Sequence, residues 1–105
     1  MQEWSREKLE DVLNNNEVVL IYLYTPMCGT CQLASKMLSI AGEVLFEYPK
    51  GKIDLNYQPE IAERWKIESV PCLLIFNKGK LNRKIYAFHS VPDLIENIKS
   101  TLKES

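Results

Sequence analysis

Two uninterrupted apolar runs stand out along the chain. Residues 18–24 read VVLIYLY, and residues 72–76 read CLLIF. Neither run alternates with polar positions. Such runs are typical of strands that are covered on both faces of a sheet, as in parallel α/β architectures.

Two further strands are predicted from weaker patterns. Residues 52–55 form one, either alone or as part of a longer segment that includes 44–48. Residues 83–88 form the other, after a turn at 77–80 (NKGK) in which Gly79 can supply the positive φ of a hairpin. The sequence therefore predicts four strands.

Between the strands, apolar residues recur every three or four positions, as on one face of a helix. Ser5 and Ser90 suit the N-caps of the first and last helices, Pro59 suits the start of a short one, and Gly42 can cap the end of another. The predicted helices follow Ser5 up to the NNN at 14–16, and cover 29–41, 58–66 and 91–102.

The predicted order is α-βα-βα-ββ-α. Strands separated by helices pair in parallel, and the closing hairpin adds an antiparallel strand. We expect an α/β fold with a four-stranded mixed sheet and helices on both faces. A chain of 105 residues suits one domain with one core, here residues 1–105.

Charge and composition exclude several classes of function. The chain has 13 basic and 14 acidic residues, a near-balance that offers no footprint for nucleic acid or an anionic membrane. The first ten residues, MQEWSREKLE, are too polar for a signal peptide, and no stretch approaches the roughly 20 apolar residues of a membrane helix. We therefore expect a cytoplasmic protein, in which paired cysteines are more often catalytic or metal-binding than structural.

The candidate chemistry lies in residues 25–38, TPMCGTCQLASKML. Cys28 falls where a buried strand meets a helix, so its sulfur faces the free N–H groups of the first turn. Those dipoles favour the thiolate and lower the pKa of the Cys28 thiol below the free value of about 8.5. Cys31, one turn further, shares that face, can close a small disulfide ring and is expected to be more buried. This asymmetry suits a nucleophile, Cys28, and a resolving partner, Cys31.

Other interpretations of the cysteines remain open. Cys28 and Cys31 can be small core residues, since cysteine is often buried and inert. A metal site is a further alternative, although structural zinc takes four ligands and the chain offers three thiols and His89, which lies far along the sequence. Cys72 is either a compact apolar side chain or a candidate third thiol near the pair, and the strand register that decides this is not fixed by the pattern.

Several of these motifs together resemble the thioredoxin family. CGTC at 28–31, SVPCLLIF at 69–76, KGK at 78–80 and GKIDLN at 51–56 correspond to the family's active-site motif, its cis-proline segment, its glycine turn and its active-site lysine segment. The resemblance extends over nearly the whole chain. It implies a thioredoxin-like fold, a cis peptide bond at Pro71 beside the sulfurs, and Lys52 near the site.

The chain departs from the family's pattern at several positions. Tyr22 stands where the family has a buried aspartate, six residues before the first cysteine, and tyrosine is no base near neutrality because its ordinary pKa is about 10. Met27 replaces the tryptophan before the first cysteine, and Thr30 replaces the proline between the cysteines. The change at Met27 alters the surface on which a substrate would dock.

The resemblance predicts a dithiol–disulfide oxidoreductase that reduces or exchanges protein disulfides. The predicted substrate contacts are Val70, Pro71, Met27, Gly29 and Thr30, with the 70–71 peptide presenting backbone groups to an extended segment. No bound cofactor is expected. Electrons would come from a thioredoxin-reductase-like donor or a low-molecular-weight thiol. The protein is expected to be a monomer. The alternative is a non-enzymatic thioredoxin-like module that binds a partner or carries metal through its three thiols.

Overall fold

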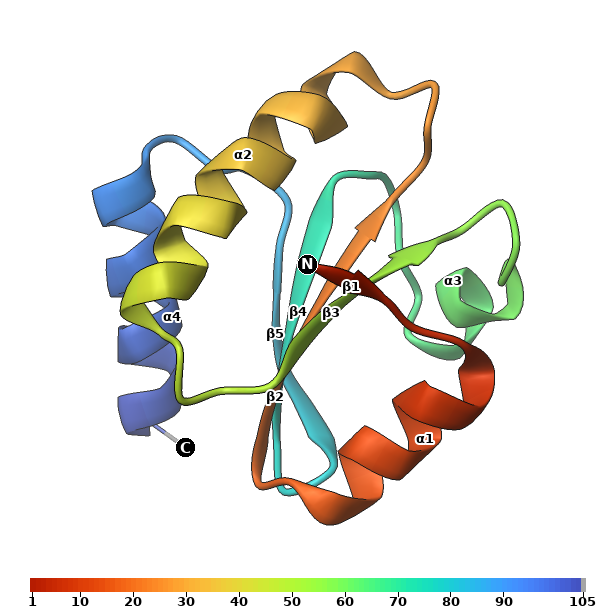
Figure 1. The fold of residues 1–105 in the computed structure, drawn as a ribbon, viewed down its shortest axis with the longest axis horizontal. Helices are drawn as coiled ribbons and strands as arrows, with labels where there is room; N and C mark the ends of the chain where they lie inside the picture. The colour runs from red at the N-terminus through yellow and green to blue at the C-terminus, as the bar shows by residue number, and fades with distance from the viewer. Residues whose placement is uncertain (105) are drawn as a thin grey trace.

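The computed structural model describes residues 1–104 of the chain. Strands and helices alternate along these residues, as the sequence predicts (Figure 1). The strands are β1 (Gln2–Glu3), β2 (Val18–Tyr24), β3 (Lys50–Asp54), β4 (Cys72–Asn77) and β5 (Lys80–Ile85). The helices are α1 (Arg6–Asn15), α2 (Gly29–Val44), α3 (Glu60–Arg64) and α4 (Val91–Glu104).

The strands form one mixed sheet in the order β1-β3-β2-β4-β5. Strands β1, β3 and β2 run parallel, whereas β4 is antiparallel to β2 and β5 is antiparallel to β4. The predicted mixed sheet is confirmed, but the count of four strands was wrong. The additional strand, β1, is only two residues long and both are exposed, so it carries no apolar pattern that a sequence could reveal.

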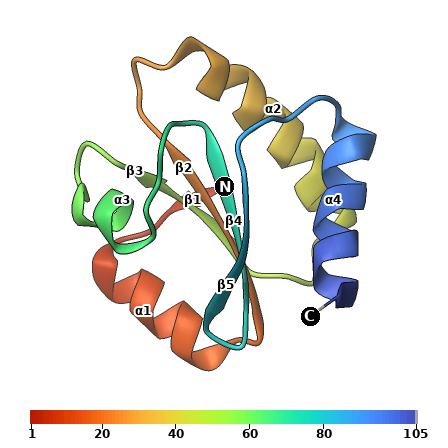
Figure 2. The same ribbon diagram turned by 180° about the vertical axis from the view of Figure 1, so that it is seen from behind.

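Helices cover both faces of the sheet, as predicted. Figures 1 and 2 show α1 and α3 on one side and α2 and α4 on the other. The strand alternation divides the core accordingly. From β2, Val19, Ile21 and Leu23 pack with the side chains of α1 and α3, while Leu20 and Tyr22 pack with those of α2 and α4.

Some predicted boundaries were wrong. Helix α2 continues through Gly42 to Val44, because Ala41 and Leu45 extend the buried side of the helix and the N–H of Leu45 bonds the carbonyl of Ala41 at 3.0 Å. Gly42 is therefore no cap, and 44–48 is not a strand. Strand β5 also begins and ends earlier than the predicted 83–88.

The two predicted serine caps and the turn are confirmed. Ser5 Oγ accepts from the N–H of Lys8 and Ser90 Oγ from the N–H of Asp93, each at 3.1 Å. Gly79 has φ of +79° in the turn between β4 and β5. Within residues 1–104, no helix is long and apolar enough to cross a membrane.

Trp4 holds the chain's first residues against the sheet. Its ring is buried and lies over Gly51 of β3, so closely that a Cβ at position 51 would come within 2.1 Å of the ring. The N–H of Trp4 donates to the carbonyl of Lys52 at 2.9 Å. A glycine is therefore required at this point of close approach.

Candidate active site

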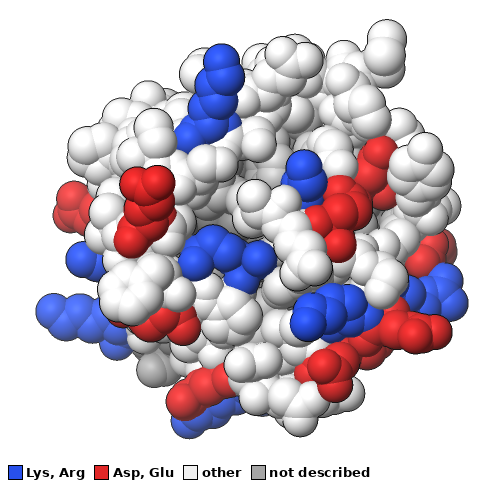
Figure 3. Space-filling model, in the orientation of Figure 1, with Lys and Arg blue, Asp and Glu red and all other residues white. Residues whose placement is uncertain are grey.

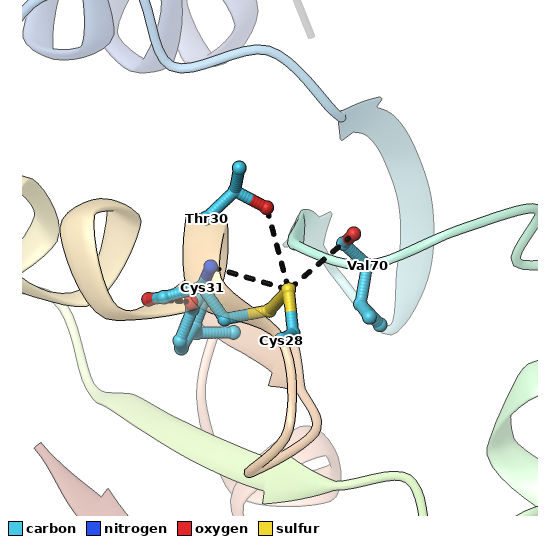
Figure 4. The surroundings of a disulfide bond; sticks show 5 residues. Cys28, Thr30, Cys31 and Val70 are labelled. Atoms are coloured by element: carbon cyan, nitrogen blue, oxygen red, sulfur yellow. Dashed lines mark hydrogen bonds between the residues drawn. A yellow bond between two sulfur atoms is a disulfide. The ribbon is translucent and has the colours of Figure 1, made fainter.

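Cys28 lies at the N-cap of α2, directly after the turn that leaves β2. Its sulfur accepts a hydrogen bond from the N–H of Cys31 at 3.2 Å and lies 3.3 Å from Thr30 Oγ1 (Figure 4). A helix leaves its first N–H groups without intrahelical partners, and these groups favour negative charge. The Cys28 sulfur thus occupies the position that stabilises a thiolate, as the sequence predicted.

Cys28 and Cys31 are joined in a disulfide, with their Cα atoms 5.2 Å apart. Their surroundings differ. Cys31 is only 3% exposed on the inner side of α2, whereas Cys28 is partly exposed. The expected asymmetry between an accessible and a buried sulfur is therefore present in the structure.

The loop before β4 faces the Cys28 sulfur from the other side. The carbonyl oxygen of Val70 lies 3.9 Å from Cys28 Sγ (Figure 4). The Val70–Pro71 peptide bond is cis. The structure therefore brings the residues of SVPC beside CGTC, across 42 residues of sequence. Met27, which is 93% exposed, and Gly29 and Thr30, both exposed, lie around the same sulfur on the chain that enters α2.

Tyr22 lies beneath the disulfide on β2. Its side chain is 1% exposed, and its hydroxyl donates to the carbonyl of Cys31 at 2.7 Å. Burial raises the pKa of Tyr22 to about 12. The hydroxyl therefore stays protonated near neutral pH and acts as a donor to the active-site backbone, with no capacity there to accept a proton from Cys31.

A second tyrosine links the site to the sheet edge. Tyr24 stacks on Tyr22 with ring centroids 5.8 Å apart, and Lys52 Nζ lies 5.5 Å from the centre of the Tyr24 ring. The Tyr24 hydroxyl donates to Glu3 Oε1 at 2.5 Å, and Glu3 Oε2 accepts from the N–H of Asp54 at 2.9 Å. Burial, reinforced by Glu3, raises the pKa of Tyr24. Lys52 is thus near the site, as the resemblance implied.

Helix α2 separates two hollows beside the cysteine pair. A groove of about 300 Å³ lies on the Pro71 side and is mostly apolar. Its lining residues are Thr30, Leu33, Ala34, Met37, Pro71, Tyr86 and Phe88. A pocket of about 380 Å³ lies on the other side of the helix and is lined by both cysteines together with tyrosine, lysine and small polar side chains.

Cys72 is not part of this cluster. Its side chain is 0% exposed and packs in the core on the α1 and α3 face, opposite the face that α2 covers. Burial raises the pKa of Cys72 to about 11, partly offset by Tyr86 and Lys84. This placement favours the packing interpretation of Cys72. In the described part of the chain, no three His, Cys, Asp or Glu side chains converge in a way that could hold a metal ion.

Sequence reasoning missed the side chains that line the two hollows. Gln32, Ser35 and Lys36 line the pocket, while Leu33 and Met37 line the groove. The helical spacing of 32, 35 and 36 places them on one side of α2, away from 33 and 37. This separation into two sides of the helix could have been predicted from the spacing. Which residues face each side of α2, however, depends on the packing of the whole domain.

Comparison with known proteins defines the class to which this site belongs. The profile of the family described as Thioredoxin matches residues 1–100. The chain belongs to the thioredoxin family, and it is a dithiol–disulfide oxidoreductase like the family's members.

Individual relatives agree with this assignment. Thioredoxin-like protein YusE of Bacillus subtilis (strain 168) is 48% identical over 99 residues, which cover 94% of this chain and 89% of the relative. A thioredoxin of Mycobacterium bovis is 32% identical over 76 residues, covering 71% of this chain and 66% of the relative. The solved structure of a mutant thioredoxin from Halobacterium salinarum superimposes with a TM-score of 0.83 at 25% identity, covering 95% of this chain and 88% of that one.

Proposed function

We propose that this chain reduces or exchanges disulfides of other proteins, with Cys28 as the nucleophile and Cys31 as the resolving thiol. In the reducing direction, the Cys28 thiolate attacks a substrate sulfur, and the substrate's other sulfur leaves with the electron pair. The Cys31 thiolate then attacks Cys28 Sγ, which restores the Cys28–Cys31 disulfide and releases the second substrate thiol.

The observation that carries these roles is the position of the Cys28 sulfur. It accepts a hydrogen bond from the N–H of Cys31 at the start of α2. Cys28 is partly exposed, whereas Cys31 is buried. A thiolate is the attacking species, and a helix N-terminus stabilises it. A buried partner thiol can reach Cys28 but is shielded from external disulfides.

The substrate is proposed to dock along the Val70–Pro71 segment as an added strand, with its backbone facing Val70. Support comes from the 3.9 Å approach of the Val70 carbonyl to Cys28 Sγ and from the apolar groove that continues past Pro71. Met27, Gly29 and Thr30 would contact the same substrate segment from the chain that enters α2. The exposed Met27 offers a flexible apolar contact, which suits varied substrates.

The cellular setting is part of the same proposal. We expect a cytoplasmic monomer that takes part in electron transport and redox homeostasis without a bound cofactor. Its electrons would come from a thioredoxin-reductase-like protein or a low-molecular-weight thiol, since the cycle leaves Cys28 and Cys31 oxidised.

The test compares three serine variants in dithiothreitol-driven cleavage of insulin disulfides. Cys28→Ser should abolish turnover, and Cys31→Ser should lose most of it. When reduced Cys31→Ser is mixed with insulin after the dithiothreitol has been removed, it should stall as a mixed disulfide, visible by mass spectrometry as a covalent adduct. Cys72→Ser is the matched control and should keep turnover within a few-fold, because its thiol lies on the other face of the sheet. Normal turnover by either of the first two variants would contradict the assigned roles.

A further inference from the structure

The pocket on the side of α2 away from Pro71 has no part in the substrate docking proposed above. Its volume is about 380 Å³, which lies within the range of small-molecule sites. Both cysteines contribute to its wall, so a molecule held there would lie against the disulfide. Its other lining residues are Tyr22, Tyr24, Thr25, Pro26, Gln32, Ser35, Lys36 and Lys52.

The pocket carries two cations from separate elements. Lys36 extends from α2 and Lys52 from β3, and neither forms an ion pair with any carboxylate of residues 1–103. The carboxylate of Glu3, on the neighbouring strand, is already bonded by the Tyr24 hydroxyl and the N–H of Asp54. Figure 3 shows a hollow between α2 and the sheet on this face, with basic side chains at its margin and acidic side chains beside one of them.

The remaining lining suits a small organic molecule that has both apolar and polar parts. The rings of Tyr22 and Tyr24 stack to form an aromatic surface, and Thr25, Gln32 and Ser35 offer hydroxyl and amide groups. Lysine ammonium groups bind carboxylates through charge-assisted hydrogen bonds, which are stronger than neutral ones. The chemistry of the pocket therefore matches a small anionic molecule. A reactive group on that molecule would lie next to the Cys28–Cys31 disulfide.

We propose that this pocket binds the carboxylate of an anionic low-molecular-weight thiol and so selects the electron donor. The proposal rests on the dithiol function above and names its reductant. The donor's thiolate attacks Cys28 Sγ, a donor–Cys28 disulfide forms, and the Cys28–Cys31 bond breaks with its electron pair leaving on Cys31. A second donor thiolate attacks the first donor's sulfur, forms the donor disulfide and releases the Cys28 thiolate, so two donor thiols are oxidised and the protein disulfide is reduced.

This placement separates the two partners of the cycle. The donor's carboxylate would lie on the Lys36 side of α2, whereas a protein substrate would lie on the Pro71 side. Each partner is then recognised by different residues, although both react at Cys28. Changes in the pocket should therefore alter the preference among thiols more than the preference among protein substrates.

The test uses two thiols of nearly equal size, N-acetylcysteine, which is anionic, and its neutral amide. Opening of the disulfide in the oxidised protein is followed by acid quenching, alkylation and mass spectrometry. Each rate is divided by the rate of the same thiol with an uncharged small disulfide, which removes differences in intrinsic reactivity. The expected result is a higher normalised rate for N-acetylcysteine, which saturates with concentration and is inhibited by N-acetylalanine.

Charge variants identify the residues responsible. The ratio of the anionic to the neutral rate should fall about tenfold when Lys36→Gln or Lys52→Gln removes one charged hydrogen bond to the carboxylate. Lys99→Gln, on the exposed face of α4, makes the same charge change outside the pocket and should leave the ratio as it is. Lys36 is exposed on a helix surface, so Lys36→Gln should fold normally. It therefore tests the proposal even if Lys52→Gln, at a half-buried position, does not fold.

Three results would overturn the proposal: a ratio near one in the unmodified protein, an equal loss in Lys99→Gln, or no inhibition by N-acetylalanine. The dithiothreitol-driven insulin assay separates this failure from a failure of the proposed function. If insulin cleavage proceeds and the charge preference is absent, only the donor proposal is wrong. If insulin cleavage is absent as well, the proposed function fails.

Discussion

Cys72 follows Pro71 directly in the sequence, yet its thiol differs from Cys28 in every respect that controls reactivity. Cys28 is partly exposed at a helix N-terminus, whereas Cys72 is fully buried among apolar side chains. Burial raises the pKa of Cys72 from 9.0 to about 11, so this thiol stays protonated at neutral pH. Only the thiolate reacts readily with alkylating agents.

We therefore expect selective labelling of the reduced protein. Iodoacetamide at pH 7.5 should modify Cys28 rapidly and Cys72 only after unfolding, as read from peptide masses. The same reaction in guanidinium chloride, where all three cysteines are accessible, is the control. Labelling of Cys72 at the rate of Cys28 in the folded protein would show that its burial is not maintained in solution.

The chemical effect of Tyr22 in place of the family's aspartate depends on its hydroxyl group. In place of the carboxylate typical of the family, it presents a hydroxyl that donates to the carbonyl of Cys31. The donor holds the backbone of the resolving cysteine, but it cannot take up that cysteine's proton. The Cys31 thiol must therefore lose its proton to another group or to water, which predicts slow resolution near pH 7 relative to a protein with the carboxylate.

At the scale of elements, the contact between β3 and the chain before α1 depends on Gly51. The Trp4 ring occupies the space that a side chain at position 51 would need. Gly51→Ala should force the ring away and destabilise the fold by about 1–3 kcal/mol, the usual cost of overpacking. Urea unfolding, followed by tryptophan fluorescence, measures this loss.

Gly29→Ala is the matched control, because nothing lies within 4 Å of a Cβ at that position. Gly29 is in the first turn of α2, where alanine is a better helix former than glycine. The free energy of unfolding should therefore be unchanged or slightly higher. Equal losses in both variants would mean that the Trp4–Gly51 contact has no special role in stability.

The elements that the sequence predicted well are those whose pattern is strong and local. Strands β2 and β4 are uninterrupted apolar runs, and serine caps mark the starts of α1 and α4. Strand β1 escaped prediction because two exposed residues form it only by pairing with β3. The end of α2 was misplaced because the buried face of the helix outweighs the helix-terminating tendency of Gly42.

The same distinction applies to the site. Cys28 and Cys31 were predictable because they are close in sequence and their position at a strand–helix junction has a direct chemical meaning. The position of Pro71 came from the resemblance, since no local rule brings residues 28 and 71 together. The lysine-lined pocket was not predictable, because Lys36 and Lys52 line the same pocket only once α2 and the sheet are in place.

At the scale of the whole molecule, the sheet separates two apolar cores, and buried titratable groups lie in both. Cys72 belongs to the core beneath α1 and α3, while Tyr22 belongs to the core beneath α2 and α4. Folding raises the pKa of each, because burial disfavours the charged form. The folded state is therefore most stable when both groups are protonated and neutral.

The protein should consequently lose stability at alkaline pH. A group whose pKa is raised on folding contributes stability fully below its unfolded pKa, and this contribution is lost as the pH rises through the folded pKa. For Cys72 the window runs from 9.0 to about 11, and for Tyr22 from 10.0 to about 12. The urea midpoint should therefore fall with pH above about 9, the unperturbed range of a thiol.

Cys72→Ala should flatten the lower part of this fall, and Tyr22→Phe the upper part. These measurements belong in a Cys28→Ser, Cys31→Ser background, which prevents disulfide exchange at high pH. Identical pH profiles in all three proteins would mean that neither group remains buried and neutral in the folded state.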